Sequence, residues 1–471
     1  MHDLKTADDP GILARIGRSI FRGPVIPRTD RERRWVVFNH LVLHLRPMRL
    51  PASTLRYTHT FGLGGMSLVL VSLLLVTGVM LMFAYVPSPD HAHDSVVNLE
   101  QQVLFGSLVR NTHYWSANLV IVVILLHLAR VFFTGAFHGP RQFNWVIGLG
   151  LLGLVLLSNF TGYLLPWDQL SYWAITISTG MVAYVPGLGA WFERFILGGA
   201  ELGPATLNGF YAYHTTVSPV LIVLLMAFHF WRVRKAGGVV SPGYAEEASG
   251  STAGGDAPRT EPDRVLFIPH LLLRETAVAL ILIAVVLLLA TAVDAPLGES
   301  ANPGMSPNPA KAPWYFLGFQ ELLLHFHPIF AVLVLPVLAA IALASVPYLR
   351  FDRQMSGPWF LTAKGRRMAI VAAMTAAILT PLWILLDEFV LDRVAWPSVV
   401  PPWISDGLLP VLLLLAAVTG FAAWIKRRYA ASGGEAVQAL FTLILVAFLG
   451  LTLIGIWFRG AGMELVWPLM V

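Results

Sequence analysis

Long apolar stretches separated by short polar connections dominate the chain. A helix that crosses a bilayer needs roughly 20 apolar residues. Nine stretches meet this requirement, at 61–84, 114–134, 145–165, 215–233, 272–293, 328–347, 368–386, 408–425 and 437–457. Residues 34–47 alternate apolar and basic side chains with a helical period, which predicts an amphipathic helix on the membrane surface. The pattern therefore predicts an all-α polytopic membrane protein.

Lysine and arginine are concentrated in alternate connections. With a cytoplasmic N-terminus, 27 of the 32 Lys and Arg residues fall on the inner side of the membrane. The other five are Arg110, Arg194, Lys311, Arg393 and Arg459. The positive-inside rule then predicts nine spans with the N-terminus in the cytoplasm and the C-terminus outside. We expect this membrane to be a bacterial cytoplasmic (inner) membrane.

Residues 241–263, SPGYAEEASGSTAGGDAPRTEPD, are rich in Gly, Ser, Ala and Pro and predict a flexible linker. The linker follows a cytoplasmic segment (1–55) and a four-helix bundle (56–240). It precedes a second membrane domain (264–390) and an extension with two more spans (391–471). About five transmembrane helices thus follow the bundle.

Composition excludes several classes of protein. Charged residues make up 13% of the chain and apolar residues 56%, whereas soluble domains carry about 25% charged residues. The net charge of +5 lies in the connections between apolar runs, which favours lipid headgroups over nucleic acid as a partner. Cysteine is absent, so this chain holds no disulfide, Cys-ligated iron–sulfur cluster or covalently attached haem.

Four histidines lie near the ends of two apolar stretches. His113 and His127 are 14 residues apart, and His214 and His229 are 15 apart. On a helix these spacings are about 21–22 Å and return to within about 40° and 60° of one face. Two antiparallel helices would pair His113 with His214 near the outer surface and His127 with His229 near the inner surface. Such pairs predict two non-covalent, bis-histidine haem b groups; the alternative is that the four are core histidines bonded to neighbouring polar groups.

Glycines with a similar spacing, and arginines next to the histidines, accompany these pairs. Gly64 and Gly78 are 14 residues apart, as are Gly148 and Gly162, and glycine lets a flat porphyrin approach the backbone. The alternative is the ordinary packing of small residues between membrane helices. Arg110 and Arg130 each lie three residues from a helix-borne histidine and suit the haem propionates, or else lipid headgroups.

These residues stand in motifs of a known family. The motifs are HTFGLGGMSLVL, LVRNTHYWSANL, LLHLARVFFTGAF, TGYLLPWDQLSYWA, FYAYHTTVSP and FHFWRVRKAGG. Residues 56–240 closely resemble cytochrome b of the Rieske/cytochrome b complexes, and the 15-residue spacing is similar to the bf branch. The back half, with PNPAKAPWYFLGFQELL at 307–323, resembles the separate subunit that follows cytochrome b in bf complexes.

The resemblance implies a di-haem subunit of a quinol:cytochrome c oxidoreductase. Such an enzyme bifurcates the electrons of quinol at an outer site. It passes one electron through both haems to an inner quinone and translocates protons. The resemblance places Tyr163, Trp314 and Tyr315 at the outer site. The family's Pro-Glu-Trp-Tyr motif begins here with Ala312, so its proton-accepting glutamate is missing.

Glu321 is one hypothesis for the missing base, because a carboxylate beside a neutral quinol is a suitable proton acceptor. The alternative is an interfacial surface residue. At the inner quinone site the family positions are Arg234, Arg274 and Glu275, which are equally consistent with positive-inside anchors. Gly62 replaces the cysteine that anchors an extra haem in the bf branch.

The resemblance also implies partners: a Rieske iron–sulfur protein, a c-type cytochrome, membrane lipids and a second copy of the complex. The missing glutamate fits a low-potential quinone such as menaquinone. The last two spans suit the docking of a partner subunit such as the c-type cytochrome. Two other classes stay open. One is a di-haem b relay subunit of a non-bifurcating, quinone-linked dehydrogenase. The other is a transporter, although the histidines lie near the surfaces and not at the midplane where transporters bind.

Overall fold

The computed structural model describes residues 11–20, 29, 49–240, 264–351, 359–360, 362–391 and 399–467. The predicted amphipathic helix at 34–47 and the linker at 241–263 lie outside these residues. Within the described part, nine helices are long and apolar enough to cross a membrane, which confirms the predicted number of spans. The protein is a multi-pass, all-α membrane protein.

Several spans are longer than the apolar runs that predicted them. The observed spans are Leu63–Met82, Gly106–Phe133, Gly139–Tyr163, Pro204–Lys235, His270–Ala292, Phe330–Tyr348, Ala363–Val390, Ile404–Tyr429 and Gly433–Trp457. The second span begins at Gly106 and not near 114, because buried polar residues continue the helix. Asn111, for example, donates to the Ala290 carbonyl (3.0 Å) and to Asp294 (2.9 Å). Hydropathy therefore marks the apolar middle of a helix better than its ends.

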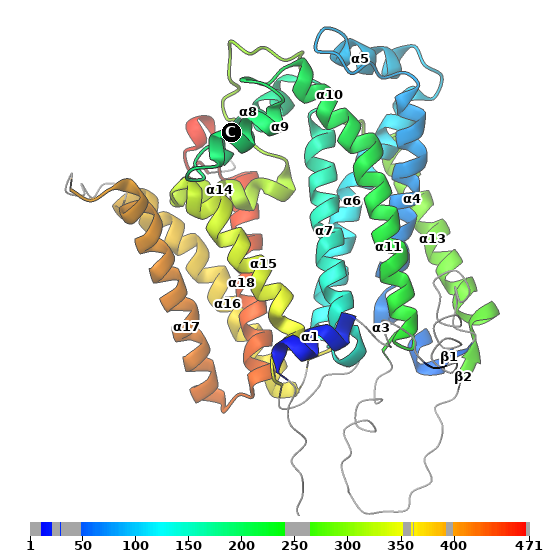
Figure 1. Ribbon diagram of the computed structural model, residues 1–471, viewed down its shortest axis with the longest axis vertical. Helices are drawn as coiled ribbons and strands as arrows, with labels where there is room; N and C mark the ends of the chain where they lie inside the picture. Colours follow the sequence, from blue (N-terminus) through cyan, green and yellow to red (C-terminus); the bar gives the residue numbers. More distant parts are fainter. Residues whose placement is uncertain are drawn as a thin grey trace, which may run out of the picture.

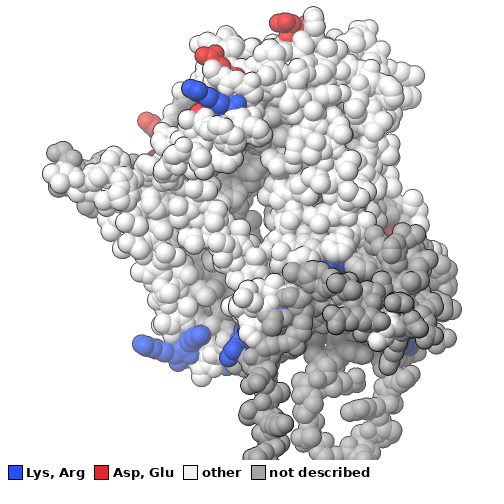
Figure 2. Space-filling view, viewed as in Figure 1, with Lys and Arg blue, Asp and Glu red and all other residues white. Residues whose placement is uncertain are grey.

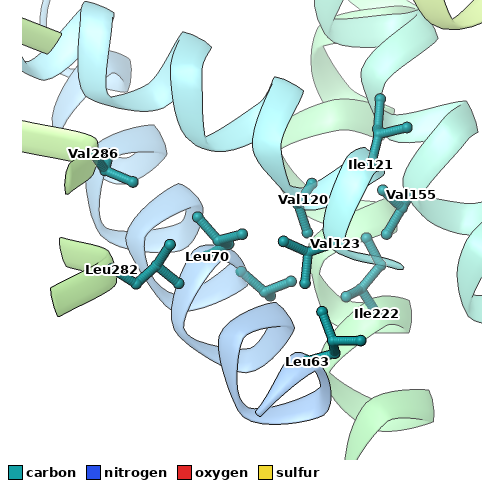
Figure 3. Packing of buried hydrophobic residues seen from close by; sticks show 10 residues of the cluster. Leu63, Leu70, Val120, Ile121, Val123, Val155, Ile222, Leu282 and Val286 are labelled. Atoms are coloured by element: carbon teal, nitrogen blue, oxygen red, sulfur yellow. The ribbon is translucent and has the colours of Figure 1, made fainter. Parts of the chain in front are cut away.

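Five long helices form the first block of the molecule (Figure 1). They are α4 (Leu63–Met82), α6 (Gly106–Phe133), α7 (Gln142–Tyr163), α11 (Ser218–Lys235) and α13 (Phe267–Ala292). Figure 3 shows their shared core, in which Leu70, Val120 and Val286 are fully buried. The helix α13 follows the linker in sequence, yet it packs against α4 and α6. The first block therefore contains one helix more than the predicted four-helix bundle.

The second block holds the remaining spans. Its elements are η4 (Trp314–Phe316), α14 (Leu317–His325), η5 (Phe330–Val334), α15 (Leu335–Ser345), η6 (Val346–Tyr348), α16 (Ala363–Leu386), η7 (Asp387–Leu391), η8 (Ile404–Leu408), α17 (Leu409–Tyr429), α18 (Gly433–Trp457) and η9 (Ala461–Met463). The helix α18 packs against both α14 and α16, whereas α17 lies at the outer edge of the block (Figure 1). Phe441 of α18 stacks on Phe132 of α6 at 3.8 Å and joins the blocks.

Short elements cover the two ends of the helices (Figure 1). One end carries α5 (Ala92–Gln101), α8 (Gln169–Val182), α9 (Gly189–Leu197) and α10 (Pro204–Ala212). The other end carries α1 (Ile12–Ile20), β1 (Arg49–Pro51), η1 (Ala52–Leu55), α3 (Tyr57–Thr60), η2 (Gly139–Arg141) and β2 (Arg264–Leu266). Strands β1 and β2 pair antiparallel, with Leu50 opposite Val265. Figure 2 shows basic side chains at this end of α17, whose last turn carries Lys426, Arg427 and Arg428.

Three spans contain a widened π-helical turn that is followed by a proline. The turns are η5, η8 and η3 (Tyr213–Val217), and Pro336, Pro410 and Pro219 follow them at the same offset. Proline lacks an N–H and its ring clashes with the carbonyl of the preceding turn. A π turn accommodates this by placing one extra residue in the turn.

Candidate functional site

The first pair of predicted histidines faces one another across the first block. His113 comes from α6 and His214 from the π turn η3, and their ring centroids are 6.2 Å apart with planes inclined by 68°. Two metal–imidazole bonds of about 2 Å in line would place the ring centroids about 6 Å apart. The separation therefore fits one metal ion between the two rings.

Each ring of this pair is oriented by a hydrogen bond at Nδ1. Thr77 Oγ1 lies 2.9 Å from His113 Nδ1, and the Ser158 carbonyl lies 2.9 Å from His214 Nδ1. A metal-bound histidine characteristically uses its second nitrogen for such a bond, which fixes the tautomer. The Nε2 atoms are thereby left for a metal.

The second pair lies at the other end of the same helices. His127 of α6 and His229 of α11 are within electrostatic range of each other. Both belong to the spans that carry the first pair. The chain therefore presents two levels of paired imidazoles, one toward each end of the first block.

The four predicted glycines each face one of the four histidines. A Cβ atom added at Gly64 would lie 3.6 Å from His127, at Gly78 3.3 Å from His113, and at Gly148 3.4 Å from His229. At Gly162 the added atom would overlap the His214 ring. The glycines on α4 and α7 thus make room for the imidazoles themselves, and contact with a porphyrin remains a prediction.

The π turn explains why the second helix spaces its histidines by 15 residues. His214 lies inside η3, so one residue of the spacing is taken up by the widened turn. The remaining rotation equals that of 14 residues in a regular helix, about 40° from one face. Both helices therefore present their histidines at matching angles. Pro219, two residues beyond the turn, was the sequence signal for this.

The two predicted propionate arginines are buried and bonded within the protein. Arg110 pairs with Glu100 and donates to the carbonyls of Ala295 and Pro296, both at 2.8 Å. Arg130 donates to the His59 carbonyl at 3.1 Å. Arg110 therefore holds the connection after α13, and Arg130 holds α3 near the second histidine pair. A propionate contact for either remains a prediction.

The Trp-Tyr segment packs against the first block. Trp314 donates its indole N–H to Asn118 of α6 at 2.7 Å, and Trp314 and Tyr315 contact the core shared by α4 and α6. Burial raises the pKa of the Tyr315 phenol, and the nearby Tyr163 and Tyr114 raise it further. Tyr315 is thus a neutral hydrogen-bond donor and not a base.

The loop after α7, which contains the sequence LPW at 165–167, bonds the connection at 299–302 that precedes the Trp-Tyr segment. Gln169 donates its backbone N–H to the Glu299 carbonyl (2.8 Å), and Ala301 donates to the Trp167 carbonyl (3.1 Å). Trp167 is buried, and Trp173 donates to the Asn302 carbonyl at 3.2 Å. Trp167 therefore packs inside the protein, and both tryptophans lie beside the connection that leads to the Trp-Tyr segment.

Glu321 lies in surroundings different from those of a quinol-facing base. Its side chain is fully buried and forms a bidentate ion pair with Arg459 of the C-terminal tail, at 2.9 and 3.0 Å. Burial opposes ionisation, but hydrogen bonds from His325 and Arg459 keep the pKa of Glu321 below its ordinary value. The alternative of a surface residue is wrong, and these contacts give a proton-accepting role no support.

The predicted inner-site residues come from two helices. Arg234 lies in the last turn of α11, and Arg274 and Glu275 lie in the first turns of α13. Arg274 is exposed and donates to the Leu55 carbonyl. They share the basic end of the molecule, and a common site remains a prediction.

Gly62 has a left-handed backbone, and a Cβ there would lie 3.3 Å from Val278.

Paired histidines at two levels of a membrane-spanning bundle suit a membrane protein that holds a metal or haem between its helices. The family model described as Cytochrome b/b6/petB matches residues 49–237. Cytochrome b6 of Synechococcus sp. (strain CC9605) is 40% identical over 175 residues, which are 37% of this chain and 80% of that protein. Cytochrome b6 of Heliomicrobium gestii is 37% identical over 206 residues, 44% of this chain and 96% of that protein. The chain belongs to the cytochrome b/b6 family and is an electron-transport protein that binds b-type haem.

A solved structure extends the likeness into the second block. A chain of a "Hyperthermophilic respiratory Complex III" matches with a TM-score of 0.58 at 23% identity, over 83% of this chain and 92% of that chain. At this identity the match shows a shared fold. Together with the family it supports an oxidoreductase subunit of a bc- or b6f-type complex.

Proposed function

We propose that this chain is the di-haem cytochrome b subunit of a quinol:cytochrome c (Rieske/cytochrome b) oxidoreductase. The observation that carries the proposal is the pair of histidine levels, His113/His214 and His127/His229, set in one bundle. The Trp314–Tyr315 segment packs on the same bundle beside α6. A one-electron carrier at each level and a quinol site beside them suit electron transfer across the membrane.

The chain's own residues would hold one haem b at each level. His113 and His214 would hold one haem, because their ring separation accommodates a metal ion, and His127 and His229 would hold the other. Bound haem supplies a site that takes up and releases one electron. Thr77 and Ser158 orient the first two rings, and the glycines on α4 and α7 keep the helices close to the imidazoles.

At the outer site the residues bind and orient quinol. The neutral Tyr315 phenol suits donation of a hydrogen bond to a quinone oxygen, and Trp314 is locked by Asn118. The rings of Trp314, Tyr315 and Phe316 contact one another and give this segment an aromatic surface. We propose that bifurcation occurs here, with one electron passing to a Rieske protein and the other into this chain.

The remaining features follow the same proposal. A c-type cytochrome accepts electrons, two copies of the complex form a dimer, and quinone is reduced near Arg234, Arg274 and Glu275. The N-terminus lies in the cytoplasm of a bacterium and the C-terminus outside its inner membrane. Protons taken up inside and released outside energise the membrane, and menaquinone fits the absence of the motif glutamate.

Replacing Tyr315 tests the outer site. In the purified complex, Tyr315→Phe removes the phenol donor, and quinol turnover is expected to fall by about tenfold with the haem spectrum unchanged. Tyr57→Phe is the matched control, because Tyr57 is 60% exposed at the opposite end of the molecule. Unchanged turnover in Tyr315→Phe would remove this residue from the site. Absence of quinol oxidation in the unmodified complex would contradict the proposed function.

A further inference from the structure

The segment that carries the Trp-Tyr pair lies along the C-terminal helix α18 and the tail that follows it. Lys311 donates to the Ile456 carbonyl at 3.1 Å, and the Gly462 backbone N–H donates to Asn308 Oδ1 at 2.5 Å. A Cβ added at Gly455 would lie 3.0 Å from Leu317. The C-terminal region therefore contacts this segment on both sides of the 3₁₀ turn η4.

Arg459 makes the strongest of these contacts. Its guanidinium donates two hydrogen bonds to the Glu321 carboxylate, at 2.9 and 3.0 Å, in the bidentate geometry that fixes both position and angle. Arg459 is 4% exposed and Glu321 is fully buried. The Arg459 guanidinium also donates to Glu388 (2.7 Å) and to the Met463 carbonyl (2.8 Å). The tail, α14 and η7 are therefore joined through one side chain.

Other charged groups complete the cluster. His325, one turn after Glu321 on α14, bonds Asp387 at 2.7 Å and lies 3.6 Å from the Glu321 carboxylate. Its Nε2 is 3.2 Å from Arg459. Lys311 lies within electrostatic range of Glu321. The cluster thus contains three carboxylates and three basic side chains. They are Glu321, Asp387 and Glu388, and Arg459, His325 and Lys311.

The place of Glu321 gives this cluster a consequence for the quinol segment. The helix α14 starts at Leu317, directly after Trp314–Phe316, and Glu321 is about one turn into it. Since a short helix moves as a unit, fixing Glu321 fixes the direction in which Trp314 and Tyr315 leave it. Gln320 adds to this by bonding the Ala312 backbone N–H (2.8 Å) and the Ala310 carbonyl (2.7 Å).

We propose that Arg459 is a positioning residue of the outer quinol site, and that the last helix and tail are an internal support of that site. The inference rests on the proposed function. It gives the last span a role inside the chain in place of the predicted docking of a partner subunit. It also gives Glu321 the role of an anchor in place of a proton acceptor.

A spin label separates positioning from chemistry. The chain has no cysteine, so Ser306→Cys places a single label on this chain beside the segment, at an exposed residue. The purified complex without this cysteine serves as the blank. In Arg459→Met we expect a narrower, more mobile label spectrum and a fall of about tenfold or more in kcat, with the haem spectrum unchanged. Arg459→Lys retains the positive charge but not the guanidinium that makes two hydrogen bonds to Glu321, so its label mobility and kcat should be intermediate.

The control is Arg427→Met, at the exposed end of α17, which should change neither readout. An unchanged label spectrum in Arg459→Met would overturn the proposal, as would a mobile label with unchanged kcat. If Arg459→Met does not accumulate, Arg459→Lys is judged by the same two readouts. If the unmodified complex oxidises no quinol but Arg459→Met still makes the label mobile, the support role stands and only the proposed function is overturned.

Discussion

At the scale of single residues, four glycines set how closely the helices α4 and α7 approach the histidines of α6 and α11. Each glycine lies opposite a different imidazole. The two on α4 are 14 residues apart, like the rings they face, whereas the two on α7 are 14 apart and face rings that are 15 apart. An added Cβ atom would make ordinary van der Waals contact with the ring at Gly64 and Gly148, and a tight contact at Gly78. The closeness is greatest at Gly162, where an added Cβ would overlap His214.

The first prediction concerns this glycine. Gly162→Ala should push the His214 ring from its position and remove the haem held by His113 and His214, leaving about one haem per chain. Gly153→Ala on the same helix is the control, because a Cβ there meets no atom within 4 Å. A pyridine haemochrome assay counts the haem. Full haem content in Gly162→Ala would mean that His214 has room that the structure does not show.

A second residue, His325, should make stability depend on pH. Burial lowers its pKa, but the hydrogen bond to Asp387 and the nearby Glu321 raise it from 6.5 to about 9. The charged imidazole therefore stabilises the folded state fully below pH 6.5, and this contribution is lost as the pH rises through about 9.

His325→Gln tests this sign. At pH 6.5 its Tm should lie about 5 °C below that of the unmodified protein, and the difference should shrink as the pH approaches 9.5. Thermal unfolding followed by intrinsic fluorescence gives both curves. A difference that is constant over this range would show that the imidazole does not titrate there.

At the scale of elements, the π turn η3 makes a 15-residue spacing equivalent to 14 residues of regular helix. Pro219 causes the turn by removing a backbone N–H from the preceding carbonyls. The π turn and Pro219 therefore depend on each other. Removing one residue of the turn and replacing Pro219 at the same time should leave both histidines in position to bind haem.

Two deletions of exposed residues test this equivalence. Deleting Thr216 together with Pro219→Ala should give a regular helix with both histidines on one face and two haems retained. Deleting Leu224, beyond the turn, rotates His229 by about 100° relative to His214 and should cost at least one haem. Equal haem content in the two deletions would refute the role assigned to the π turn.

Other elements show what the sequence could and could not predict. The nine spans and the histidine spacing follow from local periodicity, so they were predictable. The position of α18 against α14 and α16 was not, because helices of uniform hydrophobicity carry no directional signal. The Arg459–Glu321 pair joins residues far apart in the chain. The sequence contained an arginine that was predicted on the outer side and a carboxylate after the Trp-Tyr segment, but no local pattern linked the two.

At the scale of the whole molecule, the two blocks are joined where the chemistry is proposed. The loop that contains Trp167, the connection at 298–302 and the Trp314–Asn118 bond hold the second block against the end of the first block that carries α5 and α8. At the other end, Phe132 and Phe441 stack between α6 and α18.

The central claim is that two histidine pairs hold two haems in one bundle. The most direct measurement is a redox-titrated visible spectrum of the purified protein, combined with a pyridine haemochrome assay. We predict two b-type haems per chain with distinct midpoint potentials, and one haem in each of His214→Leu and His229→Leu. One haem or none in the unmodified chain, or a histidine replacement that leaves both, would contradict the account.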